Sequence, residues 1–278
     1  PLAITSPKPQ STRLPVIGLR TEGDVQFIFI DPPGLLEPGY LLQEAMLQAA
    51  SDVLRQADAV LFLHSTTGRE PAPGAPLHPA LEGLAKPLLL VLTKADLTPD
   101  RRSGTPGDEK DAAAAAGPFA GPPSRLTVSA VSGQGIPALL GWCRAHVPHR
   151  AFRYPADDVS TQPVRFFAAE FVREAAFALL GDELPYAVAV EIDEFREHSD
   201  PQYIRATIYV ERDSQKAMVI GRGGRTVKGI GMRARQAIEH LVGAAVFLDL
   251  HVKTLKRWRS SASALQRFGF PIPATRRP

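Results

Sequence analysis

A short glycine-rich turn in the second half of the chain has residue types suited to holding phosphate groups. Gly221, Gly223 and Gly224 surround Arg222, and the apolar residues 218–220 precede them. Glycines allow two backbone segments to approach closely, because no Cβ stands between them. The backbone N–H groups at the start of a following helix then face outward, where phosphates bind well. The turn therefore predicts a site for a phosphate-bearing ligand.

A basic, amphipathic helix is expected directly after this turn. Its apolar residues recur at spacings of three and four, as on one face of a helix: Val227, Ile230, Ala234, Ile238 and Leu241. Its polar positions carry basic residues: Arg225, Lys228, Arg233 and Arg235. From residue 213 onward there are thirteen Lys or Arg residues and three acidic ones, although the whole chain has a net charge of only +3. This local excess of positive charge indicates a polyanionic partner.

The turn and its two flanking helices resemble the RNA-clamping loop of a KH domain. A plain surface turn is the alternative, because a bare G-x-x-G is a weak motif. The basic surroundings favour the clamp. We therefore expect RNA contacts from eight residues: Lys216, Ile220, Gly221, Arg222, Gly223, Gly224, Arg225 and Lys228.

Polar residues with a different chemistry follow apolar stretches in the first half of the chain. Asp31 and Gly34 place a carboxylate beside a flexible backbone N–H, as contacts to a Mg²⁺-linked water and a γ-phosphate require. Lys94 and Asp96 suit guanine, because the Lys stem covers the base and the carboxylate accepts hydrogen bonds from N1–H and the 2-amino group. These residues predict a site for a guanine nucleotide.

A third loop completes this set. Ser129 and Ala130 follow another apolar stretch, and a backbone N–H there can bind the guanine carbonyl oxygen. D-x-x-G alone is nearly worthless as a signal, and [NT]-K-x-D alone is weak. All three loops in this order are a strong signal for a nucleotide site. Each follows the carboxyl end of a strand, which is where such sheets bind ligands.

The elements that must position these residues alternate in the first half. Strands are expected over residues 25–30, 59–64, 87–92 and 126–129, and helices over 40–56 and 136–147, with loop and helix over 66–85 and a short helix within 101–123. This alternation is typical of a parallel α/β sheet, and the apolar runs indicate strands covered on both faces. In the second half, a helix over 163–180 precedes strands at 187–192 and 203–211, the two helices around the turn, and a strand at 245–252.

With these elements in place, the chain resembles the Era family of ribosome-assembly GTPases almost from end to end. The phrases that carry the resemblance include residues 10–13 (QSTR), 183–186 (ELPY) and 268–270 (FGF). The resemblance implies GTP-dependent binding to small-subunit ribosomal RNA during assembly of that subunit, with GTP or GDP and Mg²⁺ as cofactors. It places a Ras-like GTPase domain at residues 1–150, a linker at 151–162 and a type II KH domain at 163–278.

The resemblance also assigns residues to the nucleotide. Thr12 and Asp31 would bind Mg²⁺ and sense the γ-phosphate, and Gly34 would contact it. The guanine base would be bound by residues of the other two loops: Thr93, Lys94, Asp96, Ser129 and Ala130. Thr93 stands where the family usually has Asn, and its hydroxyl can still tie the loop down. Leu35 replaces the water-orienting Gln of Ras-like enzymes, so slow intrinsic turnover is expected. No catalytic residue is assigned.

The phosphate-binding loop of such GTPases, G-x-x-x-x-G-K-[ST], does not occur in the sequence. Two explanations are open: a genuine loss of GTP binding, or a sequence that starts inside a longer chain. We expect the second, because the strand before this loop lies between the strands that begin at Val25 and Ala59, and its removal leaves two unpaired edges. The missing strand, loop and helix amount to about 35 residues. The chain as given should not hydrolyse GTP, and a non-hydrolysing RNA-binding assembly factor is the alternative function.

The remaining residues are interpreted as structural. Cys143, the only cysteine, excludes an internal disulfide, suits a reducing compartment and is expected to be buried. Trp258 is interpreted as a cap over the core rather than a base-stacking platform, and Glu170, Arg173 and Glu174 as a solvated helix face. No apolar run is long enough to cross a bilayer. We expect a cytoplasmic monomer, whose basic tail can also contact anionic lipid at the inner membrane, although RNA is the better-supported partner.

Overall fold

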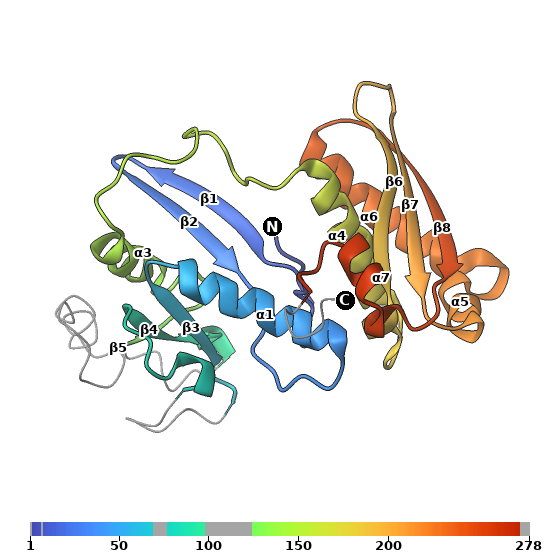
Figure 1. Ribbon diagram of the computed structural model, residues 1–278. Coiled ribbons are helices and arrows are strands. Elements are labelled where there is room, and N and C mark those ends of the chain that lie inside the picture. Colours follow the sequence, from blue (N-terminus) through green and yellow to red (C-terminus); the bar gives the residue numbers. More distant parts are fainter. Residues whose placement is uncertain (1, 7, 69–76, 98–123, 273–278) are drawn as a thin grey trace. The chain divides into compact units, whose positions relative to one another are not determined.

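The computed structural model describes residues 2–6, 8–68, 77–97 and 124–272 of the chain (Figure 1). Contacts divide the chain into two compact units. The first consists of Pro1–Leu19, Ile28–Val53 and Asp158–Pro278, and the second of Arg20–Phe27 and Leu54–Asp157. Each unit joins segments that are distant in the sequence. The domain boundaries predicted near residues 150 and 162 therefore stay a prediction.

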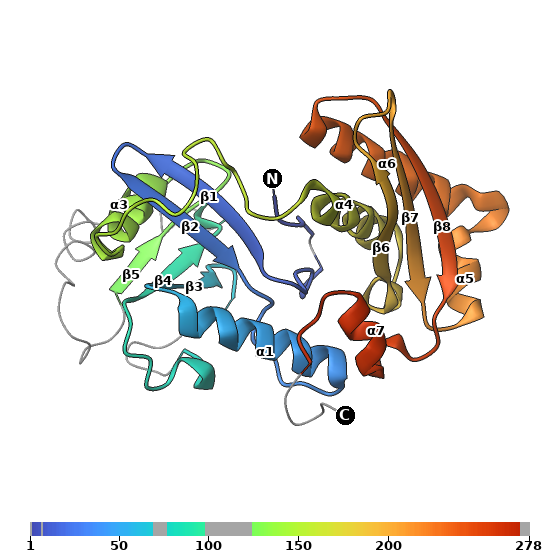
Figure 2. The same ribbon diagram turned by 45° about the horizontal axis from the view of Figure 1, so that its top comes forward.

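Three parallel strands form the sheet of the second unit. β3 (Val60–Ser65) pairs with β4 (Leu88–Thr93), and β4 pairs with β5 (Ser124–Thr127), as Figure 2 shows. The core residues Leu89 and Val91 of β4 are almost completely buried. These strands lie within two residues of the predicted ranges, and the predicted parallel α/β sheet is confirmed.

α3 (Ile136–His146) covers this sheet and contains the cysteine. Trp142 and Cys143 pack into the same apolar cluster as Leu89 and Leu126. Burial raises the pKa of the Cys143 thiol to about 11, so the thiol stays protonated at neutral pH. The interpretation of Cys143 as a buried structural residue is confirmed.

A hairpin precedes the parallel sheet, and only one of its strands was predicted. β1 (Val16–Glu22) pairs with β2 (Val25–Asp31) through a turn in which Gly23 has φ 59°. The sequence analysis missed β1, because Gly18 and Arg20 interrupt its apolar pattern. A two-residue turn that begins with a glycine at positive φ is a strong hairpin signal.

Apolar side chains on β2 and β3 are more exposed than the sequence predicts. Phe29 is 36% exposed and Leu63 is 63% exposed, although both strands were expected to be covered on both faces. In the described residues β2 pairs only with β1, and β3 pairs only with β4. Side chains project from the faces of a sheet, and at these two positions the described chain covers the face only in part, so the expectation of full coverage is wrong there.

α1 (Leu41–Gln56) matches the predicted helix closely, and its first three turns belong to the first unit. Leu42 and Met46 pack in one apolar cluster with Trp258 and Leu265. The sequence analysis placed this helix in a separate nucleotide domain. Its apolar stripe predicts the helix but carries no information about which surface it covers.

The second half of the chain forms a three-stranded sheet with helices packed on it. β6 (Ala189–Arg196) pairs antiparallel with β7 (Gln202–Val210), and β7 pairs parallel with β8 (Val246–Thr254). The helices are α4 (Val164–Leu179), α5 (Asp213–Ile220) and α6 (Arg225–Val242). The order α4-β6-β7-α5-α6-β8 is the predicted type II KH order (Figure 1).

Short elements complete the described chain. The 3₁₀ turns are η1 (Pro79–Leu81), η2 (Ala95–Leu97), η4 (Leu184–Ala187), η5 (Arg222–Gly224) and η6 (Trp258–Ser260), and α7 (Ala262–Arg267) is the last helix. Of the helix predicted within residues 66–85, only η1 falls in the described part. The short helix predicted within residues 101–123 lies outside the described residues. Among the described helices, none combines the length and apolar character needed to span a membrane.

The burial of Trp258 and Arg173 shows whether these residues are core or surface residues. Trp258 is fully buried, and its indole N–H donates to the Ala187 carbonyl at 2.9 Å, so it is a core residue as predicted. Arg173 is only 3% exposed and forms a bidentate ion pair with Glu170. The interpretation of Arg173 and Glu170 as a solvated face is therefore wrong. Charges spaced three apart on a helix look alike in sequence whether water or protein surrounds them.

Candidate functional site

The turn between α5 and α6 holds its glycines in left-handed backbone conformations. The φ angles are 73° at Gly221, 62° at Gly223 and 75° at Gly224. A Cβ on Gly221 would lie 2.2 Å from the Thr226 hydroxyl oxygen, so only glycine fits there. At Gly223 and Gly224 a Cβ would meet nothing within 4 Å. The turn is therefore tight on its inner side and open on its outer side, as a backbone clamp requires.

The start of α6 gives this open side a positive potential. Gly224 is the N-cap and has no side chain with which to cap the first N–H groups. Such N–H groups lack acceptors inside the helix and carry the positive end of its dipole. The side chains of Arg222, Arg225 and Lys228 are exposed around them, and Lys216 and Ile220 are half-buried. The predicted clamp residues are thus brought together on one turn and its flanking helices.

Packing beneath α6 fixes the orientation of this basic surface. Ile230, Ala234 and Ile238 are fully buried, as the spacing of apolar residues predicts. A Cβ on Gly229 would lie 3.3 Å from the Leu179 side chain of α4, so the two helices are closely packed at this point. The buried stripe leaves the basic residues no orientation other than outward.

The predicted guanine-reading residues lie in two adjacent loops of the second unit. Lys94 and Asp96 follow β4, while Ser129 and Ala130 follow β5, its parallel neighbour. The Ser129 hydroxyl donates to the Asp96 carboxylate with an oxygen–oxygen distance of 2.5 Å. Ser129 is fully buried and Ala130 is exposed. The carboxylate is therefore held in place from one loop while the neighbouring backbone faces outward.

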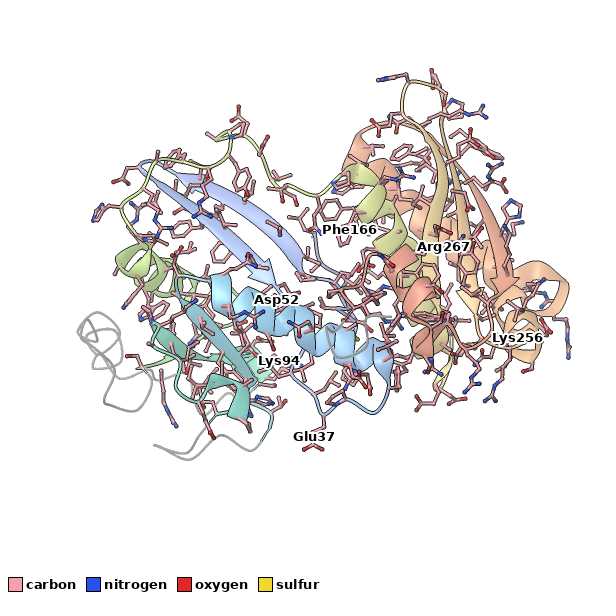
Figure 3. All side chains as sticks on the ribbon, in the orientation of Figure 1. Glu37, Asp52, Lys94, Phe166, Lys256 and Arg267 are labelled. Carbon is pink, nitrogen blue, oxygen red and sulfur yellow. The ribbon has the colours of Figure 1, made fainter. Side chains whose placement is uncertain are left out.

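Two threonines hold the Lys94 loop. The Thr93 hydroxyl donates to the His64 carbonyl at 3.3 Å, so it ties the loop down as expected. The Thr66 hydroxyl donates to the Lys94 carbonyl at 3.0 Å, a contact that the sequence analysis missed. Lys94 itself has φ 63° and an exposed side chain (Figure 3). A non-glycine residue at positive φ is uncommon and is maintained here by these surrounding bonds.

Thr12, Asp31 and Gly34 all belong to the first unit, and the first two are in contact. The Thr12 hydroxyl donates to Asp31 at 3.3 Å. Asp31 lies at the surface, yet the protein packed around its carboxylate raises its pKa, an effect that the Thr12 hydrogen bond opposes. Gly34 is exposed, and a Cβ there would meet nothing within 4 Å. The two groups of residues predicted to contact the nucleotide thus belong to different units, and their roles stay a prediction.

The metal part of the predicted site is incomplete. Mg²⁺ prefers about six oxygen ligands, of which a protein usually supplies only a few. Thr12 and Asp31 offer one hydroxyl and one carboxylate, and no cluster of three or more His, Cys, Asp or Glu side chains occurs in the described residues. The motif that would supply a further hydroxyl ligand and cradle the phosphates does not occur in the sequence. The residues present therefore fit guanine better than they fit the metal.

The residue next to Thr12 has a role that the sequence did not reveal. Arg13 is only 5% exposed, and its guanidinium donates to the carbonyl groups of Pro185 at 3.2 Å, Tyr186 at 3.0 Å and Val188. Burial, and to a lesser extent Arg173, lowers the pKa of Arg13 to about 9, so the group remains charged at neutral pH. Arg13 thereby fastens the N-terminal segment to the KH-like part of the first unit.

The fold and these groups define a class of protein: a GTPase-type α/β domain joined to an RNA-binding KH domain. A family model described as "50S ribosome-binding GTPase" matches residues 2–94, and a "KH domain" model matches residues 183–259. The chain is similar to a crystal structure of Era in complex with MgGDPNP and nucleotides 1506–1542 of 16S ribosomal RNA, with TM-score 0.84 and 30% identity. The match covers 98% of this chain and 91% of that one.

A second solved structure agrees. A variant of Aquifex aeolicus Era bound to GDP and AlF4⁻ is also 30% identical, with TM-score 0.83, and the match again covers 98% of this chain and 91% of that chain. Because the identity and the shared length are both high enough to define a family, the chain belongs to the Era family of GTPases. The predicted family and fold class are confirmed.

Proposed function

We propose that the protein binds small-subunit ribosomal RNA through its KH domain in a GTP-dependent manner and assists assembly of the small ribosomal subunit. The observation that carries this proposal is the clamp. Gly223 and Gly224 leave the start of α6 open, and the exposed Arg222, Arg225 and Lys228 surround it. The RNA ligand of the similar Era structure supports the choice of partner. Loss of RNA binding in a Gly223→Asp variant is the test.

The nucleotide is proposed to be GTP or GDP. Asp96 would accept hydrogen bonds from guanine, the Ala130 N–H would bind the base carbonyl, and the Lys94 stem would cover the base. MgGDPNP and GDP with AlF4⁻ in the two similar Era structures support this choice. When bound, Mg²⁺ would neutralise phosphate charge, and Thr12 and Asp31 are the residues that would hold it. The rest of the phosphate site depends on a motif that this sequence does not contain.

Asp96→Asn is expected to weaken guanosine binding by roughly ten- to a hundredfold, because an amide cannot accept both guanine hydrogen bonds and a charged acceptor contributes about 1.5–3 kcal/mol. The Asn oxygen can still accept from Ser129, so the loop should keep its shape. Nuclear magnetic resonance titration with guanosine, and with adenosine as a specificity control, measures the effect. Glu82→Gln removes an exposed carboxylate elsewhere in the same unit and should change nothing. Equal guanosine affinity in Asp96→Asn and the parent chain would remove Asp96 from the site.

A non-hydrolysing RNA-binding assembly factor is the second candidate, and the absence of G-x-x-x-x-G-K-[ST] from the sequence favours it for the chain as given. Backbone N–H groups and the Lys of that motif hold the β- and γ-phosphates in this class of enzyme. We expect the 278-residue chain to release phosphate from GTP no faster than a buffer blank containing Mg²⁺. A phosphate-release assay over several hours measures this. GTP turnover that disappears in Asp96→Asn would contradict the expectation and favour an intact nucleotide site.

The proposed partner also indicates a location. A protein that acts on the precursor of the small ribosomal subunit must be in the same compartment as that precursor. We therefore propose that the protein is a cytoplasmic monomer that binds the ribosomal precursor. The proposal of occasional contact with the inner membrane rests only on the basic character of the C-terminal tail, whose residues 273–278 lie outside the described part.

A further inference from the structure

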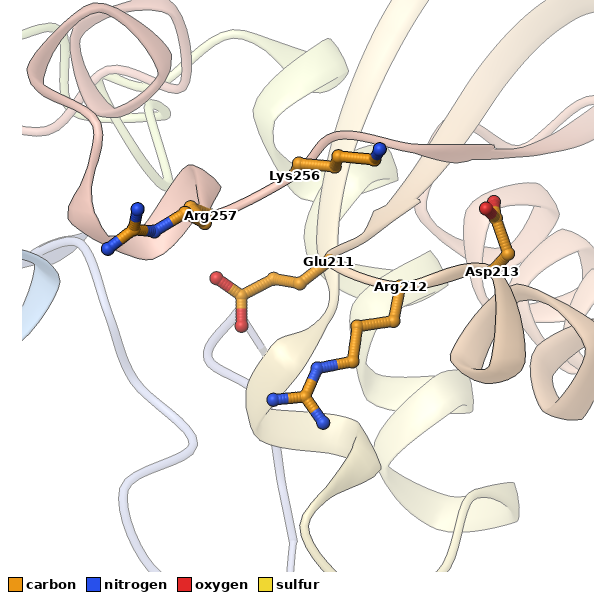
Figure 4. Close-up of a pocket in the computed structure, with 5 residues that line it drawn as sticks. All are labelled: Glu211, Arg212, Asp213, Lys256 and Arg257. Atoms are coloured by element: carbon orange, nitrogen blue, oxygen red, sulfur yellow. The ribbon is translucent and has the colours of Figure 1, made fainter.

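A hollow of about 370 Å³ lies at the N-terminal end of α5 (Figure 4). Two chain segments line it, the β7–α5 junction and the β8–η6 junction. The lining residues are Glu211, Arg212, Asp213, Lys256 and Arg257. The basic tail is evident in the sequence, but its contact with the start of α5 is not.

The two acidic residues of this hollow already have partners. Glu211 forms an ion pair with Arg259 at 2.5 Å, and Asp213 accepts a hydrogen bond from the Thr254 hydroxyl at 2.6 Å. The Gln215 side chain accepts hydrogen bonds from the backbone N–H groups of Glu211 and Arg212, each at 3.0 Å, which fixes the chain at the start of the helix. Arg259 therefore neutralises Glu211, whereas Asp213 keeps its charge and offsets one of the basic residues of the hollow.

The three basic residues of the hollow are exposed, and within the described part of the chain none of them forms an ion pair. Arg257 also has φ 55°, a conformation that costs energy for any residue with a side chain. Non-glycine residues in such conformations concentrate at functional sites. The hollow thus combines an excess of positive charge, three basic residues against the one unpaired carboxylate of Asp213, with a backbone that holds one of its cations in a strained position.

The hollow and the clamp lie at opposite ends of the same helix. α5 runs from Asp213 to Ile220, so its eight residues separate them by about 12 Å at 1.5 Å per residue. A nucleic-acid strand rises by about 3.4 Å per nucleotide, and a KH clamp holds about four nucleotides. An RNA of about eight nucleotides is therefore long enough to occupy the clamp and to reach the hollow.

We propose that this hollow binds a phosphate group of the RNA strand where the strand continues beyond the clamp, through Arg212, Lys256 and Arg257. This inference rests on the proposed function, because it requires the clamp to hold the same strand. The chemistry recognised is a phosphate diester, and a free phosphate is the other source of the same group. The hollow would lengthen the contact with RNA and add salt-dependent affinity without reading bases.

Arg257→Gly tests the proposal with little danger to the fold, because glycine adopts φ 55° without strain. Three RNAs are compared by fluorescence anisotropy: one of about four nucleotides, and two of about eight that extend it at the 5′ or the 3′ end. Arg257→Gly is expected to leave binding of the short RNA unchanged and to weaken one long RNA about three- to tenfold. The slope of log affinity against log salt for that RNA should fall by about 0.7. Arg153→Gly, which removes an exposed linker charge, should alter none of the three.

Equal affinity of parent and Arg257→Gly for both long RNAs would overturn the proposal, and so would equal weakening of all three RNAs. Titration of inorganic phosphate, followed by nuclear magnetic resonance signals of residues 256 and 257, distinguishes the source of the phosphate. Saturable binding of inorganic phosphate together with unchanged long-RNA binding would show a free-phosphate site and reject the strand. Failure of the proposed function is seen separately, as failure of the parent chain to bind the short RNA.

Discussion

Gly223→Asp is expected to abolish RNA binding while leaving the fold intact. At φ 62° an Asp residue is tolerated better than most, and a Cβ there meets nothing within 4 Å. A carboxylate at this point stands just before the start of α6, where acidic groups favour the helix, so folding should not suffer. The same carboxylate occupies the place proposed for an RNA phosphate. Like charges brought together in an interface cost several kcal/mol, so affinity should fall at least about a hundredfold.

Two matched variants separate charge from shape. Gly223→Asn adds nearly the same volume without charge and should lose only a few-fold in affinity. Gly221→Ala should instead weaken the fold, because its Cβ would lie 2.2 Å from the Thr226 hydroxyl. Filter binding at moderate salt and thermal unfolding of each variant provide both readouts. If Gly223→Asp binds RNA as tightly as the parent chain, the assignment of the clamp is wrong.

The clamp could be predicted from the sequence because its signals are local. The apolar spacing on α6 indicates which residues are buried, and the glycines mark where the backbone needs positive φ. Neither signal depends on a distant part of the chain. The predicted positions Ile230, Ala234 and Ile238 are accordingly fully buried in the structure. The same reasoning located β4 and α1 within one residue of their observed starts.

The features that sequence reasoning missed depend on residues far apart in the chain. Arg13 binds carbonyl groups more than 170 residues away, and a carbonyl group is present at every position, so no residue type announces the contact. Arg173 was taken for a surface charge because its ion pair with Glu170 has the spacing of any exposed helix pair. The hollow around Arg257 forms only where two loops meet. Local pattern does not determine which charges become buried.

Several contacts hold the N-terminal segment against α4 and the turn that follows it. The Lys8 ammonium donates to the carbonyl groups of Phe177, at 2.9 Å, and Leu180, and Arg173 donates to the Ser11 carbonyl. Arg13 contributes the most buried of these groups, and its carbonyl partners lie in and just after η4, where the negative end of a helical turn favours a cation. The free energy of unfolding of the first unit should therefore depend strongly on Arg13.

Arg13→Met is expected to lower the free energy of unfolding of this unit by about 3 kcal/mol, because methionine keeps most of the side-chain volume but removes the guanidinium that donates to three carbonyl groups. The Pro185 carbonyl keeps the Val188 N–H as a donor, so the loss is concentrated at Tyr186 and Val188. The cost of burying the cation, seen in its lowered pKa, disappears as well and limits the loss. Arg13→Lys keeps the charge but cannot reach three acceptors at once. Its free energy of unfolding should therefore lie between those of the parent chain and Arg13→Met. Urea unfolding followed by Trp258 fluorescence measures the change in a Trp142→Phe background, which removes the other tryptophan from the second unit without breaking a side-chain hydrogen bond within the described residues. Unchanged or increased stability of Arg13→Met would mean that the carbonyl groups contribute less than the buried charge costs, and the anchoring role of Arg13 would be rejected.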